Sequence, residues 1–202
     1  MTVKKIHHVA YRCRDAKETV EFYQQMLNMD FMLVFAENRA PSTKEPHPYM
    51  HVFLDAGMGN VLAFFELPNS PAMGRDHNTP EWVQHIAFEV TDMDALLEAK
   101  AKVEAAGLEV VGPTDHGIFK SIYFFDPNGH RLELAVNTPI PQQEMEKLHD
   151  LAPAMLESGI GPSAHPDRQP GCMKTNWGLT ERIVARVFPT IQLFHFDRPN
   201  TN

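Results

Sequence analysis

The chain has 202 residues, of which 43% are hydrophobic and 22% are charged, and its formal net charge is -8. These values describe a globular domain large enough to bury a core, and the acidic balance argues against a nucleic-acid partner, which would need clustered Lys and Arg. No apolar run approaches the roughly 20 residues that span a bilayer. The only two cysteines of the sequence, Cys13 and Cys172, lie far apart, which favours a reducing compartment. We therefore expect a cytoplasmic protein without nucleic-acid or membrane partners.

The first half of the chain predicts a strand, a helix and three further strands, in that order. The first strand covers residues 6–13, which are rich in β-branched and aromatic side chains. Asp15 and Glu18 form a capping-box-like pair, and apolar residues at helical spacing continue to Leu27, so we expect a helix there. Further strands are expected at 31–36, 50–55 and 61–67, separated by a polar loop with prolines and by the turn signal DAGMGN.

The same order is repeated after a proline-rich connector. A strand at 83–90 precedes a helix that begins after Asp92 and ends at Gly107. The segment QHIAFEVTD at 84–92 matches HHVAYRCRD at 7–15 almost position by position, which indicates a duplicated half-domain. The remaining strands are expected at 108–111, 121–125 and 131–136, with the tight turn DPNG between the last two.

These elements predict an α+β fold of two tandem βαβββ modules, at about 4–68 and 81–137. Their strands are expected to form a curved mixed sheet with a central metal site, within a domain that covers residues 1–138. Residues 139–202 form an extension that begins with a helix at 142–156 and continues as an irregular tail, with a short helix at 179–188.

Three side chains are candidates for a metal centre. If Val9 and Ile86 face the helices, His8 and His85 face the opposite side, where equivalent positions of duplicated modules meet at a pseudo-twofold axis. Glu133 lies in the last strand on the same face, and a buried carboxylate needs a cation, a proton or strong donors. Two imidazoles and one carboxylate favour Fe(II) or a similar divalent ion. The alternatives are structural roles for both histidines and a salt bridge for Glu133.

The paired modules, with HHVAYRCRDAKETVEFY and DPNGHRLEL, resemble the vicinal oxygen chelate superfamily, which contains glyoxalases, bleomycin-resistance proteins, epimerases and extradiol dioxygenases. The segment TDHGIFKSIYFFDPNGHRLE at 114–133 is similar to the signature of type I extradiol dioxygenases. That resemblance implies an Fe(II)-dependent enzyme of aromatic-compound catabolism, which cleaves the ring of a small catechol-like diol with O2. It also implies that Glu133 binds the iron, while His116 and Tyr123 lie beside the catecholate.

Two features depart from the extradiol pattern. The family's additional acid–base His is missing from GMGNVLAFFEL, and His51 and His77 do not match its register. The route of proton transfer is therefore open. Many extradiol enzymes have four modules, whereas this chain has two, so we expect a homodimer that completes the site or its burial.

A glyoxalase- or epimerase-type isomerase or lyase is the alternative function. If FFEL is aligned with RLEL, Glu66 becomes an additional ligand or base, which would fit a Ni(II) or Zn(II) site. If Gly59 is aligned with Gly129 instead, Ala63 takes that place and three ligands remain. The three-ligand set does not distinguish Fe(II) from Mn(II). A third hypothesis is a bleomycin-resistance-type protein that binds an aromatic compound without catalysis.

Overall fold

A computed structural model describes residues 2–158, and the short helix expected at 179–188 lies outside them. The chain divides into two units, one formed by Met1–Thr114 and Ser121–Val136, the other by Asp115–Lys120 and the residues from Asn137 onward. The first unit contains almost all of both predicted modules. The boundary expected at residue 138 between domain and extension stays a prediction.

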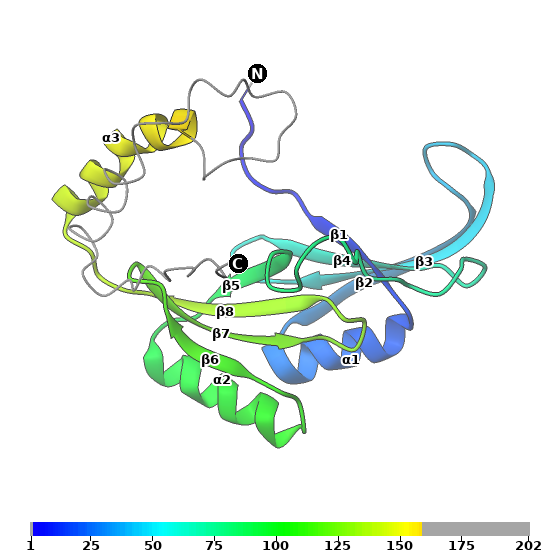
Figure 1. The fold of residues 1–202 in the computed structure, drawn as a ribbon. Coiled ribbons are helices and arrows are strands. Elements are labelled where there is room, and N and C mark those ends of the chain that lie inside the picture. Colours follow the sequence, from blue (N-terminus) through cyan, green and yellow to red (C-terminus); the bar gives the residue numbers. More distant parts are fainter. Residues whose placement is uncertain (1, 159–202) are drawn as a thin grey trace, which may run out of the picture. The chain divides into compact units, whose positions relative to one another are not determined.

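The elements follow the predicted order, β-α-β-β-β twice and then a helix (Figure 1). This confirms the α+β class and the two tandem modules, as well as the helix expected at 142–156. None of the helices in residues 2–158 is long and apolar enough to cross a membrane. The first module consists of β1 (Val9–Cys13), α1 (Ala16–Leu27), β2 (Asp30–Arg39), β3 (Pro46–Asp55) and β4 (Val61–Glu66). The second consists of β5 (His85–Glu89), α2 (Met93–Ala105), β6 (Val111–Asp115), β7 (Phe119–Phe125) and β8 (Arg131–Asn137), and α3 (Gln142–Ser158) follows.

Each module forms its own four-stranded mixed sheet, in the order β1-β4-β3-β2 or β5-β8-β7-β6. The first and last strands of a module pair in parallel, so that Val9 lies opposite Leu62 and His85 lies opposite Arg131. In the first module, β3 runs antiparallel to both of its neighbours, β2 and β4. The parallel pairing brings the last strand of each module beside its first strand, and this places β8 next to β5.

Helices α1 and α2 begin where the sequence indicates. Asp15 and Asp92 have extended backbones, and their side chains accept hydrogen bonds of 2.8 Å from the backbone N–H groups of Glu18 and Ala95. These bonds satisfy amide groups that have no partner within the helix. α1 ends at Asn28, whose φ of 53° lies in the left-handed region that closes many helices.

Several boundaries differ from the predictions. β1 begins at Val9 instead of residue 6, so that His8 immediately precedes the strand. β6 covers Val111–Asp115 instead of 108–111; the prediction was wrong because Leu108 packs against the core directly after the helix, before the strand starts. β3 reaches back into the predicted loop as far as Pro46, which is the first residue of its strand, where a missing N–H is tolerated.

Both modules bury their helix-facing strand residues in one hydrophobic core. Leu62 and Phe64 of β4 are 1% and 0% exposed, and Leu132 and Leu134 of β8 are 0% and 3% exposed. The residues between them in sequence face the other side of each sheet, because side chains alternate along a strand. The buried members of this core are Cys13, Ala16, Tyr23, Met29, Val52, Leu54, Leu62, Phe64, Leu96, Val103, Ile122, Phe124, Leu132, Leu134 and Val136.

Buried polar contacts join α1 to the turn between β7 and β8. The hydroxyl group of Tyr23 donates to the Asp126 carboxylate at 3.1 Å. Asn128 is 6% exposed, and its side chain donates to the Thr19 hydroxyl at 3.0 Å and accepts from the Arg14 backbone N–H at 2.8 Å. The turn DPNG of the second module is therefore fixed to the first module, and the two sheets share one folding unit.

We predict that Asn128→Ala destabilises the fold by about 1–3 kcal/mol, because it removes the side-chain acceptor of the Arg14 backbone N–H and the donor to the buried Thr19 hydroxyl. Urea unfolding followed by circular dichroism measures this change as a lower midpoint at an unchanged slope. The matched control is Asn78→Ala, since Asn78 is exposed in the connector. Equal midpoints for the two variants would contradict the role assigned to Asn128.

Candidate metal centre

The predicted metal ligands lie at the helix-free faces of the two sheets. Ile86 and Leu132 pack with the core, so the neighbouring side chains of His85 and Glu133 face away from the helices. Because β5 and β8 are paired, with Ala87 opposite Glu133, these two residues come from adjacent strands. The sheet of the second module thus places two of the three candidates next to one another.

Glu133 is a buried carboxylate with a partner at each oxygen. It is 3% exposed. Its Oε2 atom lies 2.9 Å from Nε2 of His85, and its Oε1 atom accepts hydrogen bonds from the hydroxyl groups of Ser121 and, at 3.0 Å, Tyr123. Burying an ionised carboxylate costs several kcal/mol unless donors or a cation compensate it. Ser121 and Tyr123 fix Oε1, which leaves Oε2 for the imidazole or for a metal ion.

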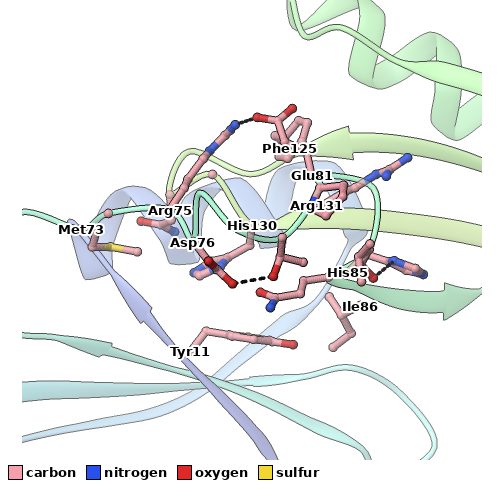
Figure 2. Close-up of a pocket in the computed structure, with 17 residues that line it drawn as sticks. Tyr11, Met73, Arg75, Asp76, Glu81, His85, Ile86, Phe125, His130 and Arg131 are labelled. Carbon is pink, nitrogen blue, oxygen red and sulfur yellow. Dashed lines mark hydrogen bonds and ion pairs between the residues drawn. The ribbon is translucent and has the colours of Figure 1, made fainter. Parts of the chain in front are cut away.

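The orientation of the His85 imidazole is fixed through Nδ1, the ring nitrogen that does not contact Glu133. Nδ1 lies 3.1 Å from the carbonyl oxygen of Val83, and Figure 2 marks this contact with a dashed line. A carbonyl oxygen only accepts hydrogen bonds, so Nδ1 carries the proton in this contact. Nε2 then faces Glu133 either as the donor of a protonated ring or, in the neutral ring, as a lone pair suited to a metal ion.

Tyr123 is held between Glu133 and a cation. It is 9% exposed, and burial, together with the hydrogen bond to Glu133, raises the pKa of its hydroxyl. The Arg131 guanidinium carbon lies 4.3 Å from the centre of the Tyr123 ring, within the range of a cation–π contact. Tyr123 therefore stays protonated at neutral pH and presents a fixed hydrogen-bond donor at the edge of the centre.

His8 lies with the sheet of the first module. Its Nδ1 atom is 2.8 Å from Nδ1 of His7, and its ring centre is 6.4 Å from that of Phe53 on β3. Within residues 2–158, no group of three or more His, Cys, Asp and Glu side chains is placed to hold a metal ion. The described chain thus brings His85 and Glu133 together and leaves His8 beside β3.

His51 is a candidate that sequence reasoning rejected. It is 6% exposed and its ring stacks on Phe65 at a centre distance of 3.6 Å. Burial, together with the electrostatic influence of the nearby His8, lowers the pKa of His51 to about 4. In the part of the chain that the structure describes, its buried Nε2 atom has no hydrogen-bond partner.

The family pattern predicts the additional acid–base His on β4. His51 lies instead on the neighbouring strand, β3. The alternation of Tyr49, His51 and Phe53 with the core residues Val52 and Leu54 was the available signal. It places His51 on the helix-free face, where its imidazole lies close enough to His8 to interact with it electrostatically.

Glu66 has a structural partner on the other side of the sheet. It continues the alternation of Leu62 and Phe64, which face the core, and its Oε2 atom accepts a 2.7 Å hydrogen bond from the Ala16 backbone N–H. A carboxylate is favourable there because the start of a helix carries partial positive charge. Of the two alignments that the sequence left open, this favours the one that places Ala63 on the helix-free face.

His116 lies in the turn after β6, within the second unit. Its ring centre is 4.7 Å from that of Phe119, and its backbone N–H donates to the Phe119 carbonyl oxygen at 2.9 Å. These contacts define a short hairpin turn that holds the imidazole against an aromatic ring. The role of His116 beside a substrate stays a prediction.

A pocket of about 560 Å³ adjoins His85, and Figure 2 shows its wall residues. On one side lies the connector, where the side chains of Arg75 and Glu81 pair and the Thr79 hydroxyl donates to Asp76 at 2.5 Å. The other walls come from β1, the start of β5 and the turn before β8. The full lining is Tyr11, Met73, Gly74, Arg75, Asp76, Thr79, Pro80, Glu81, Val83, Gln84, His85, Ile86, Phe125, Asn128, Gly129, His130 and Arg131.

Comparisons with known proteins agree with this architecture. The chain is 29% identical over 99 residues to biphenyl-2,3-diol 1,2-dioxygenase 3 of Rhodococcus globerulus, which covers 48% of this chain and 51% of that protein. It is 31% identical over 137 residues to a chlorohydroquinone/hydroquinone 1,2-dioxygenase of Sphingobium indicum, covering 65% of this chain and 39% of that protein. The chain thus spans about half, or less, of the curated relatives it matches.

The fold also matches a solved structure, that of a glyoxalase family protein from Enterococcus faecalis, with a TM-score of 0.50 and 27% identity. The match covers 67% of this chain and 99% of that one. The family model described as the glyoxalase/bleomycin resistance protein/dioxygenase superfamily matches residues 5–134, which include both modules. The chain therefore belongs to the glyoxalase/bleomycin resistance protein/dioxygenase superfamily, as its paired modules and strand motifs predicted.

Proposed function

We propose that this chain forms the metal centre of an extradiol dioxygenase, a cytoplasmic Fe(II)-dependent enzyme that cleaves a catechol-like aromatic diol with O2. The observation that carries this proposal is the contact of the buried Glu133 with both His85 and Tyr123. Glu133 and Tyr123 match the signature positions assigned to the iron ligand and to the substrate contact. The structure supports the proposal because it gives this carboxylate the partners that the signature implies.

The name of one relative supports a catechol-like substrate, and the name of the other supports a dihydroxylated aromatic ring in general. A biphenyl-2,3-diol has its two hydroxyl groups on adjacent carbons, whereas a hydroquinone has them on opposite carbons of the ring. The matched segments cover only 51% and 39% of those proteins, so the activity of the complete relatives is transferred here as a proposal. We propose a small dihydroxylated ring as substrate and O2 as the second substrate.

The donor set suits a divalent metal in its chemistry, with His8, His85 and Glu133 as the proposed ligands. When bound, Fe(II) would hold the two diol oxygens and supply electron density to O2; Mn(II) has the same ligand preference. One chain brings together His85 and Glu133, whereas His8 lies beside β3. Within residues 2–158, two of the three proposed ligands are therefore in contact.

Two side chains of the helix-free faces are suited to form hydrogen bonds with the hydroxyl groups of a diol. Tyr123 is a protonated donor at neutral pH, because burial raises the pKa of its hydroxyl. The imidazole of His51, whose pKa is lowered to about 4, is neutral at neutral pH, and its buried Nε2 atom has no partner in residues 2–158, so it can accept a hydrogen bond from a hydroxyl group of the substrate. His51 is thus the proposed contact of the first module with a substrate hydroxyl group.

The first prediction concerns the reaction itself. Protein reconstituted anaerobically with Fe(II) is expected to consume O2 with a panel of catechols and hydroquinones and to release a ring-opened product that absorbs visible light. An oxygen electrode and absorption spectroscopy measure both. His85→Ala serves as the control and is expected to lose bound iron and O2 uptake together. Turnover of a substrate without O2 would contradict the proposal and favour the glyoxalase-type isomerase or lyase.

The second prediction concerns His51. His51→Leu is expected to lower kcat by about tenfold, because it removes the proposed hydrogen-bond acceptor for the substrate, while the iron content stays unchanged. The matched control is His47→Leu, since His47 lies on the same strand but is exposed and contacts Ser70. Steady-state kinetics together with iron analysis check this; equal kcat values for the two variants would remove His51 from the mechanism.

The third prediction separates the two carboxylates. Glu66→Gln is expected to keep metal affinity and kcat, and to lower the free energy of unfolding by about 0.3–1 kcal/mol because a negative charge is lost at the start of α1. Glu133→Gln is expected to lose the metal. Calorimetric metal titration and urea unfolding of both variants measure these effects. Loss of metal in the Glu66 variant would instead support the four-ligand site of the alternative function.

A further inference from the structure

Arg131 is the cross-strand neighbour of His85 in the second module. The two residues lie directly opposite each other in the parallel pair of β5 and β8, so their side chains project from the same face of the sheet. Arg131 also precedes Glu133 by two positions in β8, which places both on the helix-free face. Figure 2 shows the guanidinium group of Arg131 and the imidazole of His85 extending toward the same side. A cation therefore borders the candidate metal centre directly.

An aromatic ring orients the guanidinium group of Arg131. The central carbon of this group lies 4.3 Å from the centre of the Tyr123 ring, and the residue as a whole is half-buried. A guanidinium group placed over the face of a ring keeps N–H donors available at its edge. Those donors form a rigid fork that matches the two oxygens of a carboxylate. Arg131 is therefore oriented for an anionic partner before one binds.

Arg75, the other arginine of the pocket beside His85, has both an aromatic ring and a carboxylate as partners. Its guanidinium carbon lies 5.0 Å from the centre of the Phe125 ring, and its side chain pairs with Glu81. Arg131 has the aromatic contact, but no carboxylate among residues 2–158 forms an ion pair with it. Glu133, the acidic residue nearest to it in sequence, uses both of its oxygens for other partners. The described part of the chain thus leaves the charge of Arg131 without a paired anion.

We propose that the substrate is an aromatic diol that carries a carboxylate group, and that Arg131 selects it by binding this carboxylate. The inference rests on the proposed function for the diol part of the substrate and adds the acidic group to it. The adjoining pocket of about 560 Å³, to which Arg131 and His85 both contribute, lies within the size range of small-molecule sites. An uncharged diol would leave the guanidinium group without an anion, whereas the acid gains a charge-assisted hydrogen bond. This difference favours the acid over the uncharged ring.

Binding of 2,3- and 3,4-dihydroxybenzoate, each compared with its uncharged amide, tests this assignment. Calorimetric titration of the full chain is carried out without O2, on the protein as isolated and after loading with Fe(II). At least one of the acids is expected to bind about tenfold or more tightly than its amide. Arg131→Met keeps an extended side chain but removes the charge, so it is expected to abolish this preference. Arg131→Lys is expected to retain part of it, because the charge remains without the fork.

The matched control is Arg39→Met, which is expected to keep the preference for the acid, since Arg39 is exposed on β2 and donates to the Lys44 carbonyl oxygen at 2.9 Å. Equal affinities of the unmodified protein for acid and amide in both pairs would overturn the inference, even if Arg131→Met failed to fold. A loss of affinity in Arg131→Met that is equal for acid and amide would overturn it as well. Selective binding of the acid without O2 uptake would overturn only the proposed dioxygenase activity, and cleavage of diols without such selectivity would overturn only the role of Arg131.

Discussion

The buried carboxylate of Glu133 is the group on which the rest of the candidate centre depends. An ionised carboxylate that is 3% exposed is stable only when its oxygens have partners, and three side chains of the same sheet provide them. Ser121 and Tyr123 donate to one oxygen, and His85 lies at the other. The alternation of strands β5, β7 and β8 therefore does more than separate core from solvent, because it gathers these partners on one face.

The two faces of each sheet have separate roles. The helix-covered faces supply the apolar core that fixes both modules in one folding unit, and the buried contacts of Asn128 and Asp126 reinforce it. Polar groups that face this side act structurally, as Glu66 does at the start of α1. The helix-free faces do not pack against the helices, so their side chains can include imidazoles and a carboxylate. The face of the sheet on which a polar side chain lies thus distinguishes candidates for a structural role from candidates for a functional one.

The sequence predicted much of this arrangement from local physical signals. Asp15 and Asp92 marked the helix starts, because their side chains cap amides within the next turn. The repeated HHVAYRCRD pattern predicted two modules, since equivalent sequences have equivalent strands and helices. The alternation of side chains in GHRLELAV placed Glu133 on the other face of its strand from Leu132 and Leu134. The start of β6 was missed, because a residue just after a helix packs in the core as readily as a strand residue does.

The sequence by itself determined the modules, their order and the types of side chain available for a metal centre, because these follow from periodicity and chemical identity along the chain. Only the tertiary structure decided where Glu66 and His51 point, because residues 61–65 are apolar on both faces and a histidine fits either side of a strand. It also decided that His8 and His85 lie on separate sheets of a chain with one shared core. Packing between distant segments sets that separation, and no local pattern encodes it.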